Sequence, residues 1–178
     1  MKATGLLTLS LALALPGASA LAQDSHASCA AHEAHETPAA HDHHSGVDER
    51  GDHVMGFPHE KTTHHFLLTK DGGVIDVSAN DASDTESRDA IRGHLGHIAK
   101  MFSAGDFDAP MLIHDRVPPG VPTLQKRKAS IHWRFEETEH GGRVVASTTD
   151  PKALAAIHDF LRFQIRDHRT GDPESISD

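Results

Sequence analysis

Cysteine, tyrosine and tryptophan are nearly missing from this chain of 178 residues, which has one Cys, no Tyr and one Trp. The single Cys29 excludes an internal disulfide bond, and no C-x-x-C-H motif for covalent haem attachment is present. Positive charge is scarce, with 17 Lys and Arg against 26 Asp and Glu, which disfavours a nucleic-acid-binding protein. The G-x-S-x-G, H-E-x-x-H, P-loop and G-x-G-x-x-G motifs are also absent, so the sequence indicates no common catalytic class.

The first 54 residues are predicted to lie outside the folded domain. Lys2, an apolar run at residues 6–15 and small residues up to Ala22 are typical of a signal peptide at residues 1–22, which predicts a periplasmic or secreted protein. Removing Lys2 with that segment changes the net charge from −9 to −10. Residues 23–54 are rich in histidine and poor in apolar side chains, so we expect a disordered tail that gathers copper or zinc ions loosely. No later segment is long and apolar enough to span a membrane.

Residues 55–172 are predicted to form a single α+β domain, followed by a frayed C-terminus at residues 173–178. The apolar periodicity and turn residues predict the following elements in chain order: strands at 64–69 and 74–79 joined by an Asp71-Gly72 turn, a helix from about 85 to 103, a loop-rich stretch at 105–126 with a short strand at 111–114, strands at 129–138 and 143–149 across Gly141-Gly142, and a helix from about 150 to 167. Both halves run strand-strand-helix. We therefore expect duplicated ββα units that form a four-stranded antiparallel sheet with two helices on one face.

Histidine is the unusual feature of the composition, with 17 residues. Alternation along the first hairpin places His64 on the apolar face and His65 on the opposite face. His94 and His97 are three residues apart on a predicted helix and could both reach one ion. Neutral imidazole is a ligand for zinc and copper. The candidate metal ligands are His64, His94, His97, His114, His158 and His168. For each of them, the alternative is a core histidine that donates to a backbone carbonyl.

Several segments occur in the order seen in one family of proteins: T-T-H-H-F, D-G-G-V, I-R-G-H-L, G-D-F-D-A-P, I-H-D, D-P-K-A-L-A-A-I-H-D-F-L and D-H. Over about residues 57–172 the chain resembles a family of small exported bacterial proteins without an established function, some of which carry the name aspartate carbamoyltransferase. The resemblance implies recurrent histidines at His64, His94, His114, His158 and His168. The Ser-Thr-Arg-Thr phosphate loop of true carbamoyltransferases is represented here only by S-T-T-D at 147–150, so this activity is not expected.

These observations lead to three functional hypotheses. The first is a periplasmic metal-binding protein that holds copper or zinc, or haem through histidine, inside the α+β domain. The second is a module that binds a protein partner or a small ligand without metal, with structural or pH-responsive histidines. The third is a metal-dependent hydrolase with three histidines and an open coordination position. Metal that survives replacement of the tail histidines would distinguish the first hypothesis from the second.

Overall fold

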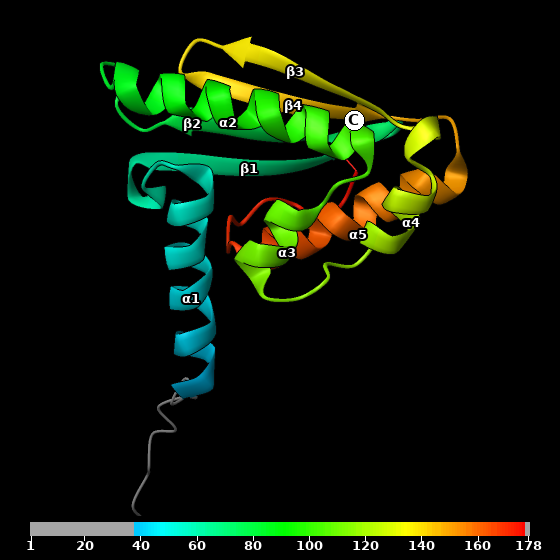
Figure 1. The fold of residues 1–178 in the computed structure, drawn as a ribbon, viewed down its shortest axis with the longest axis horizontal. Coiled ribbons are helices and arrows are strands. Elements are labelled where there is room, and N and C mark those ends of the chain that lie inside the picture. Colours follow the sequence, from blue (N-terminus) through cyan, green and yellow to red (C-terminus); the bar gives the residue numbers. More distant parts are fainter. Residues whose placement is uncertain (1–37, 177–178) are drawn as a thin grey trace, which may run out of the picture. The chain divides into compact units, whose positions relative to one another are not determined.

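The computed structural model describes residues 38–176 (Figure 1). The predicted signal peptide, the predicted tail as far as residue 37, and residues 177–178 lie outside the described residues. The elements are α1 (Pro38–Met55), a 3₁₀ turn (His59–Lys61), β1 (Thr62–Thr69), β2 (Gly72–Ala79), α2 (Thr85–Ala104), α3 (Asp108–His114), α4 (Val121–Lys126), a second 3₁₀ turn (Lys128–Ser130), β3 (His132–Thr138), β4 (Gly141–Ser147) and α5 (Pro151–Asp167). Among these elements, no helix is both long and apolar enough to cross a membrane.

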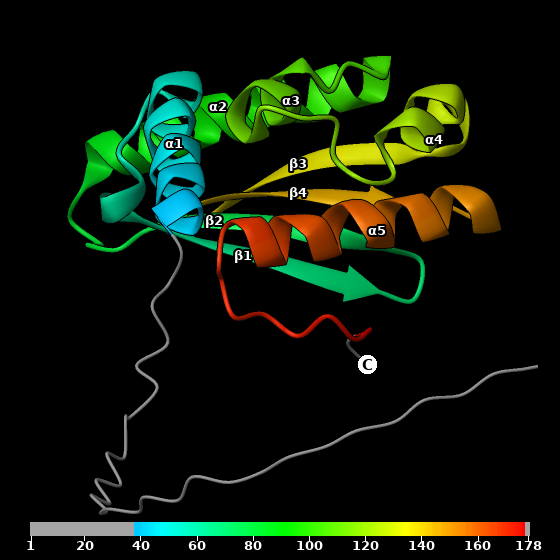
Figure 2. The same ribbon diagram turned by 90° about the horizontal axis from the view of Figure 1, so that it is seen from below.

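The four strands form one antiparallel sheet in the order β1-β2-β4-β3, which confirms the predicted α+β fold. β2 and β4 pair at the centre, where Gly72 faces Ser147 and Ser78 faces Gly141. The second strand of each hairpin therefore lies at the middle of the sheet, and the two hairpins are paired symmetrically. α5 runs along β1 and β2 (Figure 2), and α2 packs on β3 and β4, so each long helix covers the hairpin from the other half of the chain. Duplication of a ββα unit stays a prediction.

Both hairpin turns lie at different residues from those predicted. β1 and β2 are joined by Lys70-Asp71, not Asp71-Gly72, and β3 and β4 by Glu139-His140, not Gly141-Gly142. The glycines instead allow β2 and β4 to approach: a Cβ at Gly72 would lie 1.9 Å from the Ala146 carbonyl oxygen, and one at Gly141 would lie 2.1 Å from that of Val77. The first error shifts the pairing by two residues, so the predicted faces remain correct.

The predicted disordered tail is wrong for residues 38–54, which belong to α1 and lead into β1 (Figure 1). The segment has little helical amphipathicity of its own, but Val47 is 1% exposed in the structure. The Arg50 Nε also donates a hydrogen bond of 2.8 Å to the carbonyl oxygen of Ile113 in α3. Contacts with the rest of the domain thus stabilise a helix that a short peptide of this composition would not form alone.

Two further predictions are wrong. Residues 111–114 belong to the helix α3 rather than a strand, and the amide of Asp108 in its first turn is bound by the Asp106 carboxylate at 2.9 Å. Residues 173–176 are not frayed, because Ile176 forms a parallel bridge with Leu68 along the outer edge of β1 (Figure 2). Arg166 holds the same segment through an ion pair of 2.6 Å with Glu174.

The core lies between the sheet and the two long helices. Asp84 and Asp150 cap α2 and α5 through bonds to backbone amides, and Gly105 ends α2 in the left-handed conformation at φ 80°. Where α2 ends, four aromatic rings pack face to face or edge to face, with centroids 4.4 to 6.2 Å apart: Phe102, Phe107, Trp133 and Phe160. Two of these rings, Phe102 and Phe160, also line the cavity that contains the histidines.

Candidate functional site

Four histidines from four separate elements line one small cavity where β1 begins. They are His64 on β1, His94 on α2, His114 at the end of α3, and His168, which caps the C-terminus of α5. The cavity has a volume of about 70 Å³, and most of its remaining lining is apolar. The structure therefore brings together four of the six predicted ligands, which are far apart in the sequence.

The backbone explains why these side chains meet. His64 has the same strand parity as Phe66 and Leu68, so its ring lies on the helix-covered face of the sheet. His168 follows the last turn of α5, and its amide donates to the Gln164 carbonyl oxygen at 2.9 Å. The chain then turns sharply at Arg169, which has φ 53°.

The imidazole rings are close to one another. The His64 and His168 ring centroids are 6.0 Å apart, with the ring planes only 5° from parallel. His114 meets His168 edge to face at 4.9 Å. Phe57 links the other pair, because its ring lies 6.4 Å from that of His64 and 5.8 Å from that of His94. Phe57 is 4% exposed and thus forms a fixed wall of the site.

His64, His94 and His168 are half-buried, and desolvation keeps their rings neutral. Desolvation, with a smaller contribution from neighbouring histidines, lowers the pKa of His64 and of His94 to about 4. The same two causes lower the pKa of His168 to about 3. At neutral pH each ring therefore has one lone pair available, which is the form of histidine that binds metal ions.

His64 has an unused polar atom. Its Nε2 is buried and has no hydrogen-bond partner among residues 38–176. A buried polar atom without a partner costs about 1 to 3 kcal/mol, so such an atom indicates a missing water, ion or ligand.

His114 differs from the other three because both of its ring nitrogens are occupied. Nδ1 donates to the Asp167 carboxylate at 2.5 Å, and Nε2 lies 2.9 Å from Oε1 of Gln164. Burial lowers the pKa of His114, partly offset by these two hydrogen bonds. Burial raises the pKa of Asp167, but hydrogen bonds from His43 and His114 outweigh this effect, so the net pKa lies below the usual value. His114 thus supports the cluster and is not free to bind an ion.

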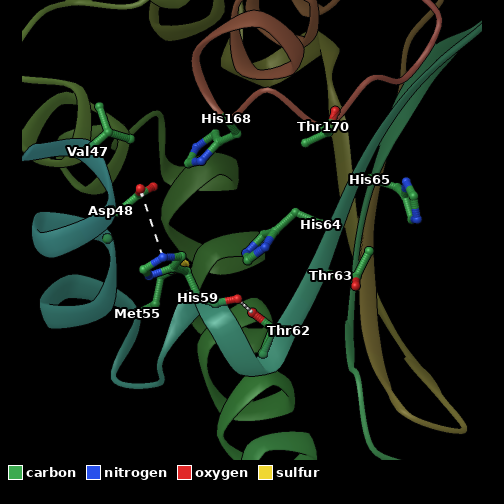
Figure 3. A pocket seen from close by; sticks show the side chains of 11 residues that line it. Val47, Asp48, Met55, His59, Thr62, Thr63, His64, His65, His168 and Thr170 are labelled. Atoms are coloured by element: carbon green, nitrogen blue, oxygen red, sulfur yellow. Dashed lines mark hydrogen bonds and ion pairs between the residues drawn. The ribbon is translucent and has the colours of Figure 1, made fainter. Parts of the chain in front are cut away.

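An outer pocket of about 270 Å³ adjoins the inner cavity between α1 and β1 (Figure 3). Three residues line both spaces: Met55, His64 and His168. Figure 3 shows His59, His64 and His168 directed into this pocket, whereas His65 points away from it. The Asp52 carboxylate lies 2.9 Å from Nδ1 of His59. Asp48 lines the pocket on the other side of the same ring, 3.9 Å from Nε2 of His59, and His64 and His168 line it too.

The remaining two predicted ligands lie elsewhere. His158 is buried, and its Nε2 donates to the carbonyl oxygens of Thr69 and Gly72 at 2.9 and 3.0 Å, which holds the first hairpin turn against α5. His97 is exposed and lines a separate groove between α2 and β3, beside Lys100 and Arg134. The close pair formed by His94 and His97 in the sequence therefore does not converge on the cavity.

Comparison with known proteins gave no match to a family model, to a curated protein or to a solved structure. The resemblance to the small exported proteins thus stays a prediction. Within residues 38–176, no three His, Cys, Asp or Glu side chains are already arranged to hold a metal ion together.

Proposed function

We propose that the protein is an exported metal-binding protein that holds one copper or zinc ion between His64 and His168, with His94 nearby. The observation that carries this proposal is the buried, unpartnered Nε2 of His64 beside the parallel ring of His168. Export follows from the predicted signal peptide and is part of the proposal.

The separation of the rings supports a shared ion. Two imidazoles on one ion have centroids about 5 Å apart in a tetrahedral site and about 6 Å apart when nearly opposite, since each metal–nitrogen bond is about 2 Å long. The His64 and His168 centroids are 6.0 Å apart, within this range. The rings are stacked with nearly parallel planes, so both side chains must rotate about their torsion angles to direct one nitrogen of each towards a common ion. His94 faces the same cavity across Phe57 and could supply a third nitrogen.

Cavity size favours an ion over a larger ligand. Pockets for drug-sized molecules usually measure about 300 to 1,000 Å³. The inner cavity measures about 70 Å³, which suits an ion and leaves no room for a haem macrocycle without opening the domain.

The first test is metal content and affinity in the full-length secreted chain, purified without an affinity tag. We expect one ion per chain, and at least a 100-fold weaker affinity in the double variant His64→Phe, His168→Phe, which keeps planar rings in the apolar surroundings. The double variant His97→Phe, His132→Phe changes two exposed histidines and should retain the ion. Fluorescence of the only tryptophan, Trp133, checks that each variant is folded.

A second control replaces His26, His32 and His35 in the predicted tail by glutamine. Stoichiometric metal in this variant supports a site in the folded domain. Equal metal binding by the His64→Phe, His168→Phe variant, or loss of all metal with the tail histidines, would contradict the proposal.

A further inference from the structure

Met55 is the third residue shared by the inner cavity and the outer pocket, beside His64 and His168. It is the last residue of α1, and its side chain is partly buried against the core. In Figure 3 its side chain lies next to His59 and faces the same pocket as His64. A thioether thus borders the place where the two neutral imidazoles meet.

This donor set discriminates between metal ions. Thioether sulfur is a soft ligand that selects copper(I), whereas structural zinc sites take four nitrogen, oxygen or thiolate ligands in a tetrahedron. Two neutral histidines with one adjacent thioether suit copper(I) better than zinc.

The outer pocket provides a route for a cation. Its rim includes Asp48, with Oδ2 3.9 Å from Nε2 of His59, and the Asp52 carboxylate lies on the other side of the same ring. These side chains are about one-third to one-half exposed, so they are accessible to ions in solution. Negative charge at the mouth of a pocket raises the local concentration of cations.

We infer that the bound ion is copper(I), held by one ring nitrogen each of His64 and His168 and by Sδ of Met55, and that it reaches them through the outer pocket past His59. This inference rests on the proposed metal-binding function and adds the identity of the ion, its third ligand and its route. Met55 is a residue of α1, so a bond from its sulfur would link the ion to this helix. The same helix contacts the rest of the domain through Val47 and Arg50.

The test compares Met55→Leu with Met101→Leu in the full chain. Met101 is a matched control because it is also partly buried against the core but lines neither the cavity nor the outer pocket. Affinities are measured for copper(I), by competition with a coloured copper(I) chelator under anaerobic reducing conditions, and for Zn²⁺. We expect Met55→Leu to weaken copper(I) binding at least tenfold and to change Zn²⁺ binding less than twofold. Met101→Leu should change neither affinity.

X-ray absorption of the copper-loaded chain gives an independent readout, because sulfur scattering should be present in the parent protein and missing in Met55→Leu. Equal copper(I) affinity in the two methionine variants would overturn the inference. If Zn²⁺ binding still depended on His64 and His168 in that case, the proposed function would stand without it. If neither ion bound to the parent chain, both proposals would fail.

Discussion

Acidification should destabilise the metal-free protein strongly because desolvation keeps the half-buried His64, His94 and His168 neutral in the folded state. The folded state holds their pKa values at about 4, 4 and 3, against 6.5 for an exposed histidine. Below pH 6.5 these histidines therefore bind protons in the unfolded chain, whereas in the folded chain they stay neutral until the pH approaches 4. Stability is fully present above pH 6.5 and is lost as the pH falls from there towards pH 4.

The magnitude follows from these pKa values. Between pH 7 and pH 5, one histidine shifted from 6.5 to about 4 reduces the free energy of unfolding by about 2 kcal/mol. The three rings together should remove about 5 to 6 kcal/mol, if their contributions add. A typical domain has a free energy of unfolding of about 5 to 15 kcal/mol, so this change would bring a marginal domain close to unfolding.

Urea titration at pH 7 and pH 5 in the presence of chelator measures this loss, with Trp133 fluorescence as the signal. His168→Phe should reduce the loss by about 2 kcal/mol, because it removes one titrating ring and keeps its contacts with His64 and Phe66. His132→Gln, at an exposed position, should leave it unchanged. A loss below about 1 kcal/mol, or an unchanged loss in His168→Phe, would refute the view that these rings are buried and neutral.

Two further predictions concern structural contacts. His158→Ala should lower the free energy of unfolding by about 2 kcal/mol in urea titration, because the carbonyl oxygens of Thr69 and Gly72 lose their donor; metal affinity should not change, and a large loss of affinity would contradict a purely structural role. Asp172→Ala should cost about 1 to 2 kcal/mol, because Asp172 accepts hydrogen bonds from the Phe66 amide at 2.9 Å and from Thr170 at 2.7 Å. Hydrogen exchange at the Phe66 amide should then become faster, and an unchanged exchange rate would show that the C-terminal segment does not protect β1.

The faces of the sheet could be predicted from the sequence because side chains alternate between its two faces along each strand. An error of two residues in the pairing therefore leaves every side chain on its correct face. Taking Asp71-Gly72 as the turn shifted the pairing, but His64 stayed on the covered face. The turns themselves were missed for a physical reason. Gly72 and Gly141 resemble turn residues, yet their lack of a side chain is needed where β2 and β4 pack closely. A single sequence does not distinguish a glycine that allows a turn from one that allows a close approach.

The site was predicted less completely, because its parts depend on contacts between distant segments. His64 could be identified from alternation alone. Met55 and His59 were missed because α1 has little amphipathicity, and only its docking through Val47 shows that it belongs to the domain. The role of His168 depends on how α5 lies across β1, which helix periodicity does not determine.

The symmetry of the sheet relates His64 to one residue of the second hairpin. Thr69 pairs with Gly72 beside the turn of the first hairpin, and Thr138 pairs with Gly141 beside the turn of the second. His64 and Trp133 lie five residues before these two threonines, so they occupy equivalent positions in the two hairpins. Trp133 packs against Phe102 and Phe107, and Phe102 also lines the histidine cavity. The smaller imidazole of His64 lines the same cavity, together with His168 and Met55. The equivalent position is thus tryptophan in one hairpin and histidine in the other, and of the two rings only imidazole has a nitrogen lone pair for a metal ion.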